Sequence, residues 1–274
     1  MISGGVERHY ARSGLLDAIR EGLKASGKDP DRLAPLDLAP IDEFHIRGRK
    51  ATLELAATVG PKATDRVIDI GCGLGGASRV LASEFGCRVS GVDLTPDYCR
   101  AAKAMAQWVG LEGKVEYKIG DALDLPFADG SFDIAWTQHA SMNIADKARF
   151  YAEAHRVLKR GGRFAIYDIL QGPSGPVHFP VPWARQPVIS HLVAPDEMRR
   201  LLEAARFEIF HWRDVSAEGR DWFTALNRRI REQGLPPLNF SLVLGPDFRE
   251  MAENQERNLS EGRILLIEAV CAKV

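Results

Sequence analysis

Residues 67–76 read VIDIGCGLGG. The first half is an apolar run typical of a buried strand, and the second half is a glycine-rich loop. Gly71, Gly73 and Gly76 match the G-x-G-x-x-G pattern of nucleotide-binding turns, in which glycine lets the backbone turn tightly and approach a ligand. That pattern is weak alone, because many strand-to-helix turns are rich in glycine. Asp69 makes this turn more specific, since a carboxylate inside a buried strand is costly unless a cation or several donors use it.

Downstream of this loop, apolar strand-like segments alternate with helix-like segments. Further strands are expected at RVSGVDL (88–94), VEYKIG (115–120), FDIAWT (132–137), RFAIYDI (163–169), FEIFHWRDV (207–215) and RILLIEAVCAK (263–273). Continuous apolar strands joined by helices favour a parallel sheet that is covered on both faces. We therefore expect an α/β fold with a Rossmann-like, mostly parallel seven-stranded sheet.

The chain before the first strand has a different character. Residues 1–46 are expected to form an N-terminal helical cap and linker: residues 5–27 have helical apolar spacing, and residues 28–46 carry three prolines and favour an irregular linker. Residues 47–274 are expected to form the main domain. Two excursions follow strand ends, where open α/β sheets bind ligands, and are candidate lid segments; they lie near 171–193 and 216–262.

Composition narrows the class of partner. The 36 basic and 37 acidic residues nearly cancel, so no global field gathers nucleic acid or an anionic membrane. No apolar run approaches the roughly 20 residues of a membrane span, and the start, MISGGVERHY, lacks the core of a signal peptide. We expect a cytoplasmic monomer or homodimer that binds a small molecule. The four cysteines show no C-x-x-C spacing, which favours free thiols and no metal site.

Asp93 ends the second expected strand, about 20 residues after the glycine loop, where an acid can accept hydrogen bonds from both hydroxyls of a ribose. The glycine loop and Asp93 together indicate a site that binds a nucleoside. The pyrophosphate of a dinucleotide would be repelled by Asp69, whereas the ammonium and sulfonium groups of S-adenosylmethionine would be attracted to it. A nicotinamide-dependent oxidoreductase remains the alternative that the glycine pattern supports.

Four motifs resemble, in order, those of the class I S-adenosylmethionine-dependent methyltransferases. They are the glycine loop with Asp69, Asp93, the run GDALDLPFADGSFDIAWTQ (120–138) and the run LKRGGRFAIYDI (158–169). Within that family, the segment WTQHASMNIADK (136–147) and the N-terminal helix with Tyr10 are most similar to small-molecule enzymes of the glycine/sarcosine and phosphoethanolamine N-methyltransferase type. The resemblance implies a fold whose last strand is antiparallel. It also implies methyl transfer to a nitrogen, oxygen or carbon of a small-molecule acceptor, with S-adenosylhomocysteine as the product.

The resemblance also implies which residues bind the cofactor: Asp69, Gly71, Gly73, Gly75, Asp93, Leu94, Asp121, Ala122 and Gln138. The glycines would let the backbone approach the methionine part, and Asp93 would bind the ribose. Asp121 and Ala122 would flank the adenine, and Gln138 would lie near the methionine tail.

Methyl transfer needs an in-line approach in a dry pocket, so positioning supplies most of the rate. A base is needed only to remove a proton from an amine or hydroxyl, and the candidates are His139, His45 and Tyr10; each could instead be structural. Phosphoethanolamine enzymes have an aspartate and a histidine where this chain has His139 and Asn143. A non-catalytic member that binds S-adenosylmethionine is therefore a second alternative.

Overall fold

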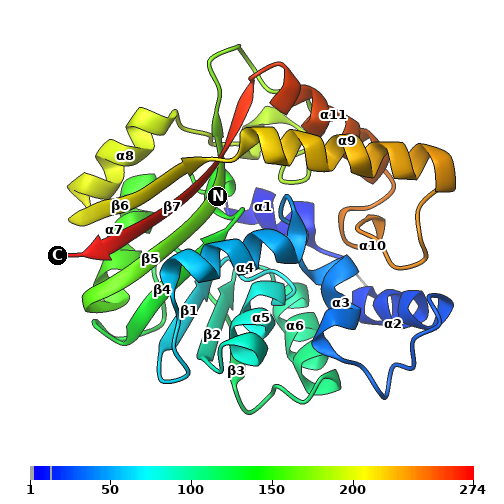
Figure 1. The fold of residues 1–274 in the computed structure, drawn as a ribbon, viewed down its shortest axis with the longest axis horizontal. Helices are drawn as coiled ribbons and strands as arrows, with labels where there is room; N and C mark the ends of the chain where they lie inside the picture. The colour runs from blue at the N-terminus through cyan, green and yellow to red at the C-terminus, as the bar shows by residue number, and fades with distance from the viewer. Residues whose placement is uncertain (1–2, 13) are drawn as a thin grey trace.

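A seven-stranded sheet organises the chain in the computed structural model, which describes residues 3–12 and 14–274 (Figure 1). The strands are β1 (Arg66–Ile70), β2 (Arg88–Asp93), β3 (Val115–Ile119), β4 (Phe132–Gln138), β5 (Leu158–Gln171), β6 (Phe207–Asp214) and β7 (Ile264–Lys273). Their order across the sheet is β3-β2-β1-β4-β5-β7-β6. β7 runs antiparallel to both of its neighbours, β5 and β6, and the other neighbouring strands are parallel. The expected Rossmann-like sheet with an antiparallel last strand is confirmed.

Helices cover both faces of this sheet. One face carries α4 (Gly48–Val59), α5 (Gly76–Glu84) and α6 (Pro96–Trp108); the other carries α7 (Lys147–Val157) and α8 (Pro195–Ala204). Alternate side chains of one strand enter the two cores, so Ile134 and Trp136 pack on the first face and Ala135 on the second. The strands read as continuous apolar runs because both of their faces are buried.

The N-terminal segment is more structured than its sequence suggested. Residues 5–27 do not form one helix, because Gly14, at a left-handed φ of 72°, separates α1 (Ser3–Tyr10) from α2 (Leu15–Ala25). The expectation of an irregular linker over 28–46 was wrong where α3 (Pro35–Asp42) forms. Pro35 suits the first helical position, and the Asp37 carboxylate accepts a hydrogen bond from the Ala34 N–H at 2.9 Å.

A buried ion pair fastens α3 to the body of the protein. Arg79 of α5 donates to the Asp42 carboxylate at 2.5 Å, and both side chains are almost fully buried. The same guanidinium donates to the Leu74 carbonyl at 2.7 Å. The cap is thus joined to the helix that follows the glycine loop.

Glu43, next to this pair, gives the fold a pH dependence. Burial, together with the adjacent Asp42, raises the pKa of Glu43 to about 8, against roughly 4.3 in an unfolded chain. The folded state therefore binds this proton more tightly. The corresponding stability is present below about pH 4 and is lost as the pH rises through 8.

We expect Glu43→Gln, which mimics the protonated side chain, to raise the melting temperature much more at pH 8.5 than at pH 5. Calorimetry at the two pH values checks this, with Glu84→Gln as the exposed control. Equal shifts of the Glu43→Gln protein at both pH values would contradict the assigned pKa.

The excursion near 216–262 forms a late helical layer that lies outside the sheet (Figure 1). Its helices are α9 (Ser216–Gln233), α10 (Ser241–Leu244) and α11 (Phe248–Ser260), and two short 3-10 helices, η1 (Ser141–Asn143) and η2 (Pro187–Ile189), lie in the loops after β4 and β5. Asn258 of α11 exchanges two hydrogen bonds with the backbone of His178, at 2.8 and 3.0 Å. The excursion at 171–193 is thereby fixed to α11. No helix in the described part of the chain is both long and apolar enough to cross a membrane.

Candidate active site

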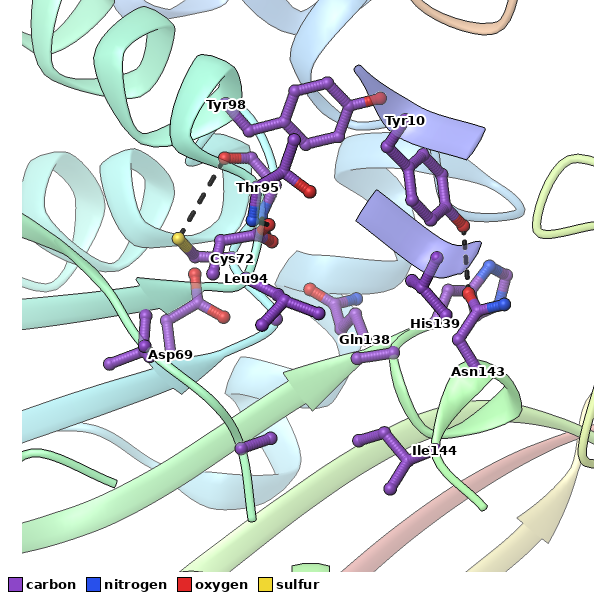
Figure 2. A pocket seen from close by; sticks show the side chains of 18 of the residues that line it. Tyr10, Asp69, Cys72, Leu94, Thr95, Tyr98, Gln138, His139, Asn143 and Ile144 are labelled. Carbon is purple, nitrogen blue, oxygen red and sulfur yellow. Dashed lines mark hydrogen bonds between the residues drawn. The ribbon is translucent and has the colours of Figure 1, made fainter. Parts of the chain in front are cut away.

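A cavity of about 360 Å³ opens at the carboxyl ends of β1, β2 and β4. Asp69, Asp93 and Gln138 line it from these three strands, and α1 lies across it, so Tyr10 faces Asp69 from the other side (Figure 2). The predicted residues that the structure brings to this lining are Asp69, Gly71, Gly73, Asp93, Leu94, Asp121, Ala122, Gln138, His139, His45 and Tyr10. Gly75 lies outside the lining and has a structural role. It precedes α5 at a φ of 78°, where a Cβ would overlap the Tyr117 ring.

The glycine loop needs glycine for reasons of backbone and space. Gly71 and Gly73 have φ angles of 76° and 52°, which side chains rarely tolerate. A Cβ on Gly71 would also overlap the Cβ of Ala140. These two residues present bare backbone to the cavity.

We expect Gly71→Ala to lower the free energy of unfolding by about 2–3 kcal/mol, from left-handed strain plus overpacking. Gly110→Ala is the matched control, since Gly110 has a similar φ of 68° and open space around its Cβ position; its cost should be about 1–2 kcal/mol, from left-handed strain alone. Urea denaturation measures both. Equal losses of unfolding free energy in the two variants would show that the overlap with Ala140 adds no destabilisation.

Asp93 is held by the backbone on both carboxylate oxygens. Oδ2 accepts from the Gly73 N–H at 2.8 Å and Oδ1 from the Thr95 N–H at 2.9 Å. Burial raises the pKa of Asp93, and these two donors oppose the rise. The carboxylate thus fixes the glycine loop and keeps further lone pairs for a ligand.

The electrostatics of the cavity favour a cation. Asp69 is buried and accepts from the Ser78 hydroxyl at 2.6 Å, and burial raises its pKa to about 6. The described lining includes five aspartates and neither lysine nor arginine. A pyrophosphate would meet repulsion here, whereas an ammonium or sulfonium group would meet attraction.

Gln138 is oriented by a chain of hydrogen bonds from α4. Its Oε1 lies 2.9 Å from Trp136 Nε1 and 3.1 Å from the Thr52 hydroxyl, which lies 2.7 Å from the Glu43 carboxyl. The Thr52 hydroxyl has a single proton. When a protonated Glu43 donates to the Thr52 oxygen, Thr52 is free to donate its own proton to Gln138 Oε1. Nε2 of Gln138 is buried with no partner among the described residues. No sequence signal links Thr52 to this site, because the contact joins residues 86 positions apart.

His139 follows β4 at a left-handed φ of 52°. Its ring stacks on Tyr167, with centroids 5.3 Å apart and an interplanar angle of 3°. Burial holds the pKa of His139 well below its usual value, so the imidazole is neutral near pH 7. Its Nε2 has no hydrogen-bond partner in the described part of the chain.

Tyr10 is held by Asn143, which occupies the position where the family resemblance implies a histidine (Figure 2). Nδ2 of Asn143 donates to the carbonyls of Trp183 and Ile189, both at 2.8 Å. These two bonds turn Oδ1 toward Tyr10, whose hydroxyl donates to it at 3.0 Å. Burial raises the pKa of Tyr10, so it remains a phenol. Asn143 therefore joins the cap to the loop at 171–193, a role that the sequence did not reveal.

His45 also lines the cavity, but its Nε2 is occupied. It lies 3.0 Å from the Gly48 carbonyl and 3.1 Å from the Thr52 hydroxyl.

All four cysteines are buried free thiols, and no group of His, Cys, Asp or Glu among the described residues is arranged to hold a metal ion.

Known proteins resemble this chain in sequence and in fold. Residues 68–166 match the family model described as "Methyltransferase domain". The chloroplastic tocopherol O-methyltransferase of Arabidopsis thaliana is 38% identical over 167 residues, which cover 60% of this chain and 48% of that protein. The chain thus spans about half the length of this curated relative, and between 29% and 49% of the length of three others.

Two solved structures share the fold. Phosphoethanolamine N-methyltransferase 2 of Haemonchus contortus, crystallised with phosphomonomethylethanolamine and S-adenosylhomocysteine, aligns with a TM-score of 0.78 and 19% identity, over 100% of this chain and 60% of that one. The [4+2]-cyclase SpnF aligns with a TM-score of 0.72 and 21% identity, over 99% and 96%. Residues 68–166 therefore form a methyltransferase domain, set in a sheet whose strand order is described above.

Proposed function

We propose that the chain transfers a methyl group from S-adenosylmethionine to a nitrogen, oxygen or carbon of a small molecule and releases S-adenosylhomocysteine. The observation that carries the proposal is the cavity beside the glycine loop, whose described lining has five aspartates and no basic residue. Relatives named for methyl transfer to small molecules, such as the tocopherol enzyme, support it.

The residues present fit this cofactor. Asp69 would attract the ammonium group of its methionine part, and the unpartnered Nε2 of Gln138 would donate to the carboxylate beside it. Asp93, next to Leu94, would accept from the ribose hydroxyls. Asp121 uses Oδ1 for the Leu123 N–H at 2.9 Å, which leaves Oδ2 for the adenine amine beside Ala122.

When bound, S-adenosylmethionine supplies an electrophilic methyl group on a positively charged sulfur. The chain itself positions the reactants and excludes water. Tyr10 and Phe44 cover the cavity, and the hydrogen bond from Tyr10 to Asn143 keeps this cover in place.

Of the three candidate bases, we propose His139. His45 already uses Nε2, and Tyr10 already donates its proton to Asn143. His139 has a neutral ring with an unpartnered Nε2, which can accept a proton from an amine or hydroxyl. His139→Asn is the test, because asparagine tolerates the left-handed backbone. It should lower kcat and leave the affinity for S-adenosylhomocysteine unchanged.

Titration calorimetry tests the proposed function. S-adenosylhomocysteine should bind with a Kd in the micromolar range or below, and NAD⁺ and NADH should not bind. Binding of NADH without S-adenosylhomocysteine would favour the oxidoreductase alternative.

A non-catalytic member that binds the cofactor is the second candidate, and its support is Asn143 at the position where the family resemblance implies a histidine. A screen of phenols, amines and activated carbon acids with the [methyl-³H] cofactor separates the two. Methyl transfer that is lost in Asp93→Ala would exclude the non-catalytic candidate.

We also propose that the protein acts in the cytoplasm as a monomer or homodimer, without nucleic acid or membrane partners. Four buried free thiols fit a reducing compartment, and the nearly balanced charge supports a small-molecule partner. Sedimentation velocity measures the oligomeric state.

A further inference from the structure

A second, smaller cavity of about 30 Å³ adjoins the first. Tyr10, Phe44 and His139 line both cavities, so the proposed base lies where they meet. The volume has room for two or three water-sized groups. It suits one end of a molecule whose remainder lies in the larger cavity.

The walls of this cavity are apolar and largely aromatic. They include Trp183 from the excursion after β5, and Trp222, Phe223, Phe240 and Phe248 from the late helical layer. Its described lining contains no Asp, Glu, Lys or Arg. An ionised group buried here would have no counter-charge, which is costly.

One polar side chain from α11 interrupts these apolar walls. Gln255 is 1% exposed, lines the second cavity, and its Oε1 has no hydrogen-bond partner among the described residues. A buried carbonyl oxygen without a donor destabilises the fold. The amide is satisfied if a ligand brings a donor to it.

We propose that the methyl acceptor is an uncharged, mainly apolar molecule carrying an O–H or N–H group that donates to Gln255 Oε1. Gln255 is then a specificity-determining residue for the end of the acceptor that enters the second cavity. This proposal rests on the proposed methyl transfer and adds the substrate class. Acceptors with a phosphate or carboxylate at that end are excluded by the uncharged walls.

Binding to the protein saturated with S-adenosylhomocysteine tests the proposal without turnover. The probes are methylhydroquinone kept reduced with ascorbate, 4-methoxy-2-methylphenol, which has one hydroxyl fewer, and the charged 2,5-dihydroxybenzenesulfonate. The variants are Gln255→Met, which keeps the side-chain length, and Gln233→Met at an exposed glutamine of α9 as the control. Calorimetry gives each Kd, and quenching of Trp183 and Trp222 fluorescence reports entry into the second cavity.

We expect Gln255→Met to raise the Kd of methylhydroquinone about 5- to 10-fold, the effect of one hydrogen bond, and Gln233→Met to leave it unchanged. The methoxy probe should bind more weakly to the native protein and respond less to Gln255→Met, and the sulfonate should not bind. The proposal is overturned if the two phenols respond alike to Gln255→Met, if the sulfonate binds as well as the diol, or if neither phenol binds.

A thermal melt separates a ligand-binding amide from a structural one. Removing an unpartnered amide should leave the melting temperature of Gln255→Met equal to or above that of the native protein. A clear fall would show that the amide supports the fold, and would overturn the assignment. Failure of S-adenosylhomocysteine to bind the native protein would instead refute the proposed function, which keeps the two failures distinct.

Discussion

Replacing Asp93 by alanine is expected to weaken binding of S-adenosylhomocysteine by about 100- to 1000-fold. The carboxylate accepts from the N–H groups of Gly73 and Thr95, so its loss frees the glycine loop as well as the ribose position. Hydrogen bonds to a charged group contribute about 1.5–3 kcal/mol each, and a loss of 3–4 kcal/mol gives this factor. Titration calorimetry on protein whose fold is verified by circular dichroism provides the measurement.

The matched control is Asp97→Ala. Asp97 lies four residues further on in α6, pairs with Arg100 near the surface and is not part of the cavity lining. Its removal should change the Kd less than threefold. Asp93→Asn, which keeps one acceptor oxygen, should fall between the two. A folded Asp93→Ala protein with nearly native affinity would refute the placement of the ribose.

Arg79→Met is expected to lower the free energy of unfolding by about 3–5 kcal/mol, the usual cost of leaving a buried charge without its partner. Asp42 would lose its counter-ion, and α3 would lose its ion pair with α5. Burial already raises the pKa of Asp42, so the variant should take up a proton there. Urea denaturation at pH 7 measures the loss.

Arg100→Met is the control for Arg79→Met, because Arg100 forms an exposed pair within α6. Exposed pairs contribute about 0–1 kcal/mol. The double variant Asp42→Leu/Arg79→Met should recover part of the loss, since it leaves no buried charge. An Arg79→Met protein as stable as the Arg100→Met protein would show that α3 is held by apolar packing alone.

The sheet and most of the cavity-lining residues named in the sequence analysis could be predicted from the sequence because their signals are local. The strand at 67–70, its glycine turn and Asp93 have fixed spacings that follow from the geometry of one strand-helix-strand unit. The structure brings these residues to one cavity, because the carboxyl ends of neighbouring parallel strands lie at the same edge of the sheet.

Contacts between distant segments could not be predicted. The prolines at 28–46 favoured a linker, yet Pro35 begins a helix that the Asp42 to Arg79 pair holds in place. In the sequence, Asn143 is only a departure from a family pattern, because its bonds to Tyr10 and to the loop at 171–193 depend on tertiary packing. Gln255 sits in a helical stretch with no motif, and only the cavity around it reveals a role.

A crystal structure with S-adenosylhomocysteine bound tests the central claim most directly. We predict that the ribose hydroxyls contact Asp93, that the ammonium group lies on the side of Asp69, and that the sulfur faces the junction of the two cavities beside His139. A ligand bound elsewhere, or a sulfur turned away from His139 and the second cavity, would contradict the account.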